Sequence, residues 1–412
     1  MNPFGEENHQ TIVHLRELVH TFYSSNNPTI RKEVEHQLTQ YLESDNAGKL
    51  LQHAVQLGDQ ELLFFSLNAF YNFIKRRRFS TEIIQQLLQH IMALHQQSNQ
   101  LPIFLLNKMN SVISYTIAMY ILQTKCNPMI VLQSYSSLDL QIQLLHGIYE
   151  TIDILPYDLS VQLQKLITSF QKEIMTMFIQ TNNLSSILIL SDAVQYSSTF
   201  PKELLSSLLQ IVYLSLKNST YVDYSLDLFS NLFIRASELI EQPFLQMTTQ
   251  VIQLIILLQT PNALQTLINF SIAFYDAPIL IDIIPVLLQY CSTSLENCVD
   301  VMEFFEEMYT LYDDTPELES SLQKFSIEYL KLLIPLCCVH SFDDESIVTR
   351  SKLRAGLNCI SEISNSLYFD CLKSFLIQNQ SNQMVVESIC FLWEAVDKLP
   401  QELASVHIHR PN

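Results

Sequence analysis

Two stretches decide the fold: FYSSNNPTIRKEVEHQLTQYL (Phe22–Leu42) and DQELLFFSLNAFYNFIKRRR (Asp59–Arg78). In the first stretch, Asn27 is a favourable N-cap, and Pro28 takes the first helical position, where its missing N–H costs no hydrogen bond. Apolar residues then recur at every fourth position: Ile30, Val34, Leu38 and Leu42. This spacing predicts a helix with one apolar stripe that packs against neighbouring helices.

The second stretch is apolar on more than one face. Its apolar residues include Leu62, Leu63, Phe65, Phe70, Phe73 and Ile74. A helix of this kind needs neighbours on several sides, as in a stack of helix pairs. It closes with four cations, Lys75 to Arg78, which the C-terminal end of a helix dipole favours, and which are either a solvated cap or a contact to an acidic partner. We predict that each stretch is the second helix of a pair.

The composition favours an all-helical chain. With 412 residues, the chain is too long for one compact core, so it contains several domains or an elongated repeat array. It has five glycines, far below the usual frequency of about 7%, and strands, hairpins and phosphate-binding loops all depend on glycine. The net charge of −19 argues against nucleic acid as a direct partner. The acidic surface suits basic protein partners, or simply solubility.

Apolar helical patterns follow one another along the whole chain, separated by short polar breaks. At two of the breaks, Thr260 and Thr315 are expected N-caps, each followed by a proline at the first helical position. Taken two helices at a time, the period is about 40 residues, the spacing of HEAT repeats. We therefore predict one continuous, right-handed α-solenoid of about ten HEAT-like helix pairs, without a domain linker.

The first two helix pairs resemble the N-terminal domain of the importin-β (karyopherin-β) superfamily. The residues that carry the resemblance are Leu18, Phe22, Tyr23, Ser25, Asn27, Pro28, Arg31, Glu33, Glu35 and Leu38, then Phe64, Phe65, Leu67, Phe70 and Ile74. Where the family usually has an Ala-Trp pair, this chain has Ala47 and Gly48. The resemblance divides the chain into residues 1–125, similar to the family's Ran-binding arch, and residues 126–412, which continue the same repeats.

Later segments extend the resemblance. Residues 144–160 are similar to the family's fourth repeat, in which Leu-Pro is followed by an acidic residue. The order of Val301–Tyr309, Asp343–Arg354 and Val385–Pro400 resembles the transportin-SR, importin-thirteen and exportin-T branch. Members of the family are about twice as long as this chain, so the resemblance covers only their N-terminal half.

The resemblance implies a nuclear transport receptor, or a shortened relative, that shuttles between cytoplasm and nucleus. The implied partners are the GTP-bound form of the small GTPase Ran, a protein cargo that is expected to be basic, and Phe-Gly nucleoporins on the outer helices. The Ran-binding residues that we expect on the second helices of the first three pairs are Arg31, Glu35, Asn68, Lys75, Lys108 and Asn110. A loop of acidic residues is a second candidate, for cargo or Ran: Asp343, Asp344 and Glu345.

Two other functions stay open. The chain is alternatively a HEAT-repeat scaffold that assembles a cytosolic complex without Ran binding, or a regulatory subunit of an enzyme. The N-terminal pattern at residues 18–38 favours the transport receptor, because a generic scaffold does not need it.

No pattern points to catalysis, a cofactor or a metal. The five glycines are isolated, which excludes the Walker and dinucleotide fingerprints, and no H-E-x-x-H, C-x-x-C or EF-hand loop occurs. We expect a packed helix to contain Cys337 and Cys338, which lie beside His340. We expect solvent exposure, and not zinc binding, for His407 and His409. The eight cysteines are predicted as buried free thiols in a reducing compartment. The longest apolar runs are too short to span a bilayer. We therefore predict a protein that is not an enzyme and has no membrane or nucleic-acid partner.

Overall fold

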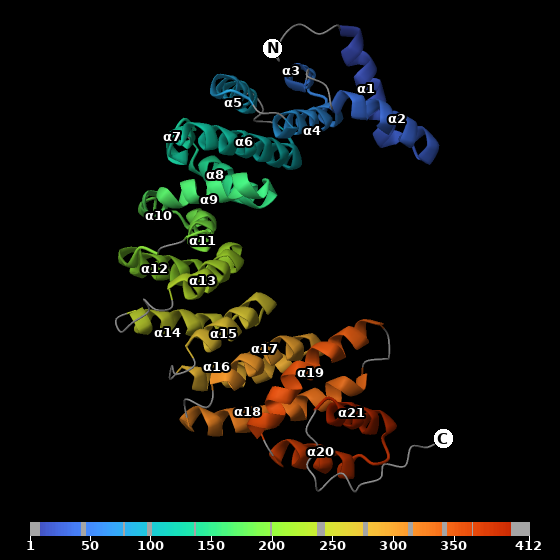
Figure 1. Ribbon diagram of the computed structural model, residues 1–412, viewed down its shortest axis with the longest axis vertical. Coiled ribbons are helices and arrows are strands. Elements are labelled where there is room, and N and C mark those ends of the chain that lie inside the picture. The colour runs from blue at the N-terminus through green and yellow to red at the C-terminus, as the bar shows by residue number, and fades with distance from the viewer. Residues whose placement is uncertain are drawn as a thin grey trace. The chain divides into compact units, whose positions relative to one another are not determined.

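The computed structural model contains only helices among its regular elements in the described residues, which are 9–42, 47–76, 79–96, 101–135, 137–197, 200–236, 244–274, 279–311, 316–339, 344–364 and 366–396 (Figure 1). These residues form 21 α-helices and three short 3₁₀ helices. The all-α prediction is confirmed. The chain divides into two compact units, Met1–Ser198 and Thr199–Asn412, each of which is described by itself. The functional boundary expected at residue 125 stays a prediction.

The first unit contains five successive helix pairs. They are α1 (His9–Ser24) with α2 (Pro28–Leu42), α3 (Ala47–Leu57) with α4 (Gln60–Arg76), α5 (Thr81–Gln96) with α6 (Ile103–Thr124), α7 (Pro128–Leu132) with α8 (Leu138–Ile154), and α9 (Tyr157–Ser169) and α10 (Gln171–Gln180) with α11 (Ile187–Gln195). The second helices contact each other in chain order, α2 to α4, α4 to α6, α6 to α8 and α8 to α11. This row of second helices positions the candidate site.

The second unit continues with five more pairs. They are α12 (Leu205–Ser215) with α13 (Val222–Ala236), α14 (Phe244–Ile255) with α15 (Pro261–Ala273), α16 (Leu280–Cys291) with α17 (Leu295–Leu311), α18 (Pro316–Val339) with α19 (Asp344–Ser364), and α20 (Ser366–Gln378) with α21 (Gln383–Glu394). Here α13, α15, α17 and α19 contact each other in order. The ten pairs agree with the number that the sequence period predicts.

Helix α2 buries only part of its predicted stripe. Val34 and Leu38 are buried, whereas Ile30 is 43% exposed, and the side chain of Leu42 lies outside the described residues. Residues 28 to 33, at the start of α2, are all exposed, so Ile30 buries much less of its surface than Val34 and Leu38 do. By contrast, all six apolar residues named for α4, which lie on more than one of its faces, are buried.

The predicted caps form where the sequence places them. The Asn27 side-chain oxygen accepts a hydrogen bond from the Thr29 N–H at 3.0 Å, and the Thr260 hydroxyl accepts one from the Ala263 N–H at 3.2 Å. Thr315 lies outside the described residues. These bonds satisfy amides that the first helical turn leaves without a partner.

The predicted acidic loop is wrong for two of its three residues. Helix α19 begins at Asp344 and includes Glu345, while Asp343 lies outside the described residues. Carboxylates are favourable in the first turn of a helix, because they complement the positive end of its dipole, so these residues start a helix instead of extending a loop.

The remaining sequence expectations concern cysteines, metals and membranes. The seven cysteines of the described part are free thiols, as predicted, but only Cys291, Cys298 and Cys337 are buried and the other four are half-buried. His340, His407 and His409 lie outside the described residues. Across the described ranges, no set of three His, Cys, Asp or Glu side chains is placed to hold a metal ion. Within the same ranges, no helix has both the length and the apolar character to cross a membrane.

Candidate protein-binding surface

The surface where α4 meets α6 brings several predicted site residues together. On α4, Asn68, Tyr71 and Lys75 are three and four residues apart and therefore share one face. The Tyr71 ring meets the Tyr115 ring of α6 edge to face, with centroids 5.0 Å apart. One turn before Asn68 on α4, Phe64 lies 6.2 Å from Phe104 of α6 by ring centroids.

Two lysines lie over the ring of Tyr71. The Nζ of Lys108 is 5.2 Å from the ring centroid, and the Nζ of Lys75 is 5.9 Å from it. Such cation–π contacts hold the ammonium groups in place without neutralising them. Among the described residues neither lysine forms an ion pair, although acidic residues outnumber basic ones by 42 to 23 in the chain. Burial lowers the pKa of Lys108. We call Asn68, Tyr71, Lys75 and Lys108 the α4–α6 surface.

The other expected Ran-binding residues lie in different surroundings. Arg31 and Glu35 are exposed on α2, and the guanidinium of Arg31 lies 5.2 Å from the centroid of the Phe22 ring. Asn68 is half-buried and donates to the carbonyl of Phe64 within its own helix at 3.0 Å. The structure thus brings Lys75 and Lys108 together on the Tyr71 ring, with Asn68 on the same face of α4. Within the described residues, no hydrogen bond, ion pair or ring contact joins Arg31 or Glu35 to them.

The Asn110 side chain is buried and bonds to neighbouring helices. It is only 8% exposed, its Oδ1 is 3.0 Å from Nε2 of His95, and its Nδ2 donates to Oε1 of Gln143 at 2.8 Å. These contacts join α5, α6 and α8. Burial lowers the pKa of His95, and the hydrogen bond to Asn110 opposes this shift. Asn110 therefore orients neighbouring helices beside the α4–α6 surface.

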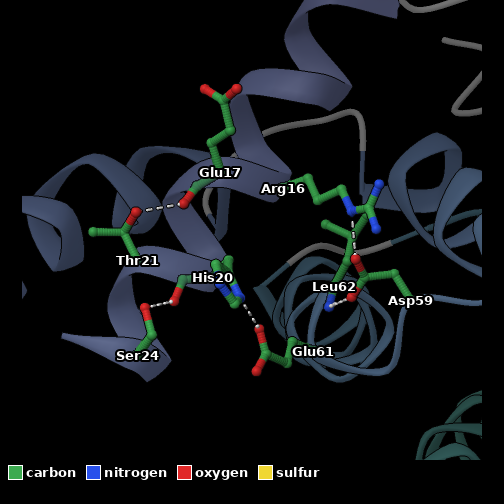
Figure 2. A network of polar contacts seen from close by, with 8 residues as sticks. All are labelled: Arg16, Glu17, His20, Thr21, Ser24, Asp59, Glu61 and Leu62. Atoms are coloured by element: carbon green, nitrogen blue, oxygen red, sulfur yellow. Dashed lines mark hydrogen bonds and ion pairs between the residues drawn. The ribbon is translucent and has the colours of Figure 1, made fainter.

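A polar network joins α1 to the start of α4 (Figure 2). The Nε of Arg16 donates to Oδ2 of Asp59 at 2.6 Å, and Oδ1 of Asp59 accepts from the N–H of Leu62 at 3.1 Å. Next to it, Nδ1 of His20 lies 3.2 Å from Oε2 of Glu61. Asp59 therefore caps α4 and holds α1 with one carboxylate. Arg16, His20 and the capping role of Asp59 were not singled out from the sequence.

A second polar cluster lies between α8 and α11. Nδ1 of His146 is 2.7 Å from Oδ2 of Asp192, and its Nε2 is 3.6 Å from Oε1 of Glu150. The Tyr196 hydroxyl donates to Oδ2 of Asp153 at 2.9 Å. The hydrogen bond with Asp192 raises the pKa of His146, whereas burial raises the pKa of Asp192. The sequence signal was the one-face spacing of His146, Glu150 and Asp153, which reading the sequence did not use.

In the second unit, acidic side chains of the second helices α13 and α17 accept hydrogen bonds from α15 between them. Nδ2 of Asn262 donates to Oδ1 of Asp223 at 3.0 Å, which links α15 to α13. Nε2 of Gln265 donates to Oε2 of Glu303 at 3.2 Å, which links α15 to α17. On α17, burial and then the charges of two neighbouring glutamates raise the pKa of Glu306. Of these acids, Glu303 and Glu306 lie in the segment Val301–Tyr309 noted in the sequence, and Asp223 lies on α13.

Comparison with known proteins identifies the class of fold. No protein-family model matches the sequence, and no curated protein matches it. Importin beta, solved in an ammonium sulfate condition, is similar with a TM-score of 0.53 at 11% identity, over 94% of this chain and 52% of that chain. The karyopherin Kap121p bound to the SUMO protease Ulp1p is similar with a TM-score of 0.50 at 14% identity, over 95% and 50%. Kap121p bound to RanGTP is similar with a TM-score of 0.50 at 13% identity, over 94% and 49%.

These similarities confirm an α-solenoid of HEAT-like helix pairs as the class of fold. At this level of identity, the similarities establish only the fold and not the function. The chain spans about half the length of the karyopherins that it matches.

Proposed function

We propose that this chain is a nuclear transport receptor, or a shortened relative, that binds the GTP-bound form of Ran through residues 1–125. The observation that carries the proposal is the α4–α6 surface, where two lysines lie on one tyrosine ring without a carboxylate partner among the described residues. A positive site on an acidic chain selects an acidic face of a partner and suppresses contact with basic proteins. The similarity to a karyopherin solved with RanGTP makes Ran the partner to test first.

The proposed contact residues act in different ways. Lys75 and Lys108 supply the charge, and Asn68 and Arg31 with Glu35 extend the surface along α4 and α2. Asn110 is not proposed to contact the partner, because its amide already bonds to His95 and Gln143 of neighbouring helices. It is proposed to hold these helices in position. The branch of the superfamily proposed from the sequence remains transportin-SR, importin-thirteen and exportin-T.

Cargo is proposed to bind to the second helices of the second unit. The acids of α17, together with Asp343, Asp344 and Glu345, suit a basic protein segment. Buried or clustered carboxylates gain most from a cationic partner, because each otherwise pays for desolvation or repulsion. The raised pKa of Glu306 is in line with this proposal.

Phe-Gly nucleoporins are proposed to bind between first helices. A cavity of about 700 Å³ lies between α18 and α20, with Ile327, Leu367 and Phe375 among its apolar lining residues. An aromatic side chain fits a groove of this composition. With these partners, the protein would act by binding, without catalysis, and would shuttle between cytoplasm and nucleus through the pore.

The experiment that tests the proposal is a titration of the 412-residue chain with Ran loaded with GTP or GDP. The transport proposal predicts binding of the GTP form and at least about tenfold weaker binding of the GDP form, since a tenfold ratio needs only about 1.4 kcal/mol of differential contact. A scaffold without Ran binding predicts no nucleotide dependence. The titration should extend to high micromolar concentration, because a chain that covers half of its relatives offers fewer contacts to an embraced partner.

A further inference from the structure

The α4–α6 surface continues beyond its lysines into a longer open strip. Between residues 62 and 74 of α4, the positions that escape burial are Phe64, Asn68, Tyr71 and Asn72. Between residues 103 and 118 of α6, the open positions all lie at or before residue 111. The ring pairs Phe64–Phe104 and Tyr71–Tyr115 occur in the same order along both helices, so α4 and α6 run in the same direction (Figure 1). We call Phe64, Phe104 and the α4–α6 surface together the α4–α6 strip.

The end of the strip at Phe64 is apolar. The Phe104 side chain is 52% exposed, and Ile103, next to it in the chain, is 76% exposed. Phe104 is the only phenylalanine that the structure shows as exposed within the described residues. Large apolar side chains are mostly buried in folded proteins, and neighbouring exposed ones mark sites of interaction. This end therefore offers contact area to an apolar side chain of a partner.

The other end of the strip is cationic. Tyr71 follows Phe64 by seven residues, which is about 10 Å along a helix axis. Lys75 and Lys108 lie over the Tyr71 ring, at 5.9 and 5.2 Å from its centroid. Both ammonium groups lack an ion pair within the described ranges, so a carboxylate of a partner would be their first.

The acids that precede Phe64 on α4 fix which end attracts a negative charge. Asp59 and Glu61 lie at the start of the helix, where Arg16 and His20 contact them (Figure 2). A carboxylate of a partner is therefore disfavoured near Phe64, because it would meet acids whose basic partners are already engaged. The strip thus selects an apolar group at one end and a negative group at the other.

We propose that the α4–α6 strip binds an acidic amphipathic helix of a protein partner, with an apolar side chain on Phe64 and Phe104 and carboxylates at Lys75 and Lys108. A helix satisfies its own backbone hydrogen bonds, so side-chain contacts alone are enough to hold it. Its residues i, i+7 and i+11 share one face and match the spacing of Phe64, Tyr71 and Lys75.

The test uses the full chain and blocked, fluorescently labelled helical peptides in an alanine–glutamine host, titrated at low salt by fluorescence anisotropy. The acidic peptide carries Phe at one position and Glu seven and eleven residues further on. Three matched peptides replace both Glu by Gln, replace Phe by Ser, or carry a central Pro that prevents a continuous helix. We expect the acidic peptide to bind, and each of the other three to bind at least about fivefold more weakly.

Variants of the protein locate the peptide. Lys75→Gln with Lys108→Gln should weaken the acidic peptide by at least about fivefold, so that it binds no better than the Gln peptide. Phe104→Ser should weaken it by about fivefold and leave the melting temperature unchanged, because that side chain is already half exposed. The controls are Lys165→Gln with Lys217→Gln, which makes the same change of net charge, and Ile130→Ser, which removes another exposed apolar side chain.

The proposal is overturned if the wild type does not bind the acidic peptide, if any of the three matched peptides binds equally well, or if the lysine variant binds like its control. Because the proposal deepens the proposed function and rests on it for the surface used, Ran-GTP is titrated in parallel. Peptide binding without Ran-GTP binding would remove Ran as the partner and keep the helix site. Binding of Ran-GTP without peptide binding would remove the helix site and keep Ran.

Discussion

At the residue scale, the His146–Asp192 pair predicts a pH dependence in the first unit. The hydrogen bond with Asp192 raises the pKa of His146 above its ordinary value of 6.5. Stability from the imidazolium is therefore fully present below pH 6.5 and is lost as the pH rises through the folded-state pKa. Asp192 acts in a lower pH window: burial raises its pKa above the ordinary value of 3.8, so stability falls there as the pH rises and the carboxyl ionises, and His146 opposes this shift.

His146→Gln keeps a hydrogen-bonding side chain but removes the charge. We expect it to lower the free energy of unfolding by about 1 kcal/mol at pH 6, the difference between a charge-assisted and a neutral bond, and by much less at pH 9. Urea denaturation at both pH values measures this, with His53→Gln as the control. Equal losses at the two pH values would argue against a charged His146.

Asp59 combines a helix cap with an ion pair, and two substitutions separate the roles. Asp59→Asn keeps an N-cap oxygen for the Leu62 amide and loses the charge that faces Arg16, whereas Asp59→Ala loses both. We expect Ala to cost about 1 kcal/mol more than Asn, the value of an N-cap. The ion pair at the surface contributes less than about 1 kcal/mol. Thermal unfolding measures both variants, and equal losses for Asn and Ala would contradict the capping role.

Single residues show where reading the sequence is limited. Lys75 and Lys108 were correctly placed on second helices, but Tyr71, which brings them together, was not singled out, because its role depends on a contact between α4 and α6. Asn110 was expected on an open surface and is buried, because its partners His95 and Gln143 come from other helices. Spacing within one helix cannot show either contact.

At the element scale, α2 contains a matched pair of apolar positions. Leu38 is buried and Ile30 is 43% exposed on the same predicted stripe. Leu38→Asp should cost about 3 kcal/mol or more, because it buries a charge without a partner, whereas Ile30→Asp should change stability by less than about 1 kcal/mol. Hydrogen exchange should rise first in α1, α2 and α4, which pack together. Equal effects of the two substitutions, or a uniform rise along the chain, would contradict this packing.

The contact between α17 and α19 depends on a glycine. A Cβ on Gly356 would lie 1.8 Å from Cγ of Met302, so the Met302 side chain occupies the space that a side chain at this position would need. Gly356→Ala should destabilise the second unit by about 1 to 3 kcal/mol through overpacking. Adding Met302→Ala should recover part of that loss, because it removes the clashing atoms. A double variant no more stable than expected from the sum of the two single losses would contradict the contact.

Helix caps and apolar periods were readable from the sequence, since they depend on neighbouring residues along the chain. Asn27 and Thr260 cap their helices as predicted. The error at Asp344 and Glu345 has a local cause: consecutive acids are common both in loops and in first helical turns, and the local pattern does not distinguish them.

At the scale of the whole molecule, the class of fold followed from the scarcity of glycine and the period of the helix pairs. The function depends on which surface of the protein binds which partner. These surfaces form between helices that are distant in sequence, so the sequence alone does not reveal them. The α4–α6 surface lies in the region that the sequence resemblance assigns to Ran, which makes one binding measurement decisive.

That measurement is the affinity of Ran-GTP for the double variant Lys75→Glu with Lys108→Glu, at low and at high salt. Lys165→Glu with Lys217→Glu is the control, since it makes the same change of net charge and includes a lysine that also lies over a tyrosine ring, 3.9 Å from its centroid. We predict at least about tenfold weaker binding for the α4–α6 variant at low salt, a smaller loss at high salt, and unchanged helix content by circular dichroism. Equal affinity of the wild type for Ran-GTP and Ran-GDP, no binding of either, or the same affinity in both double variants would contradict the proposed function.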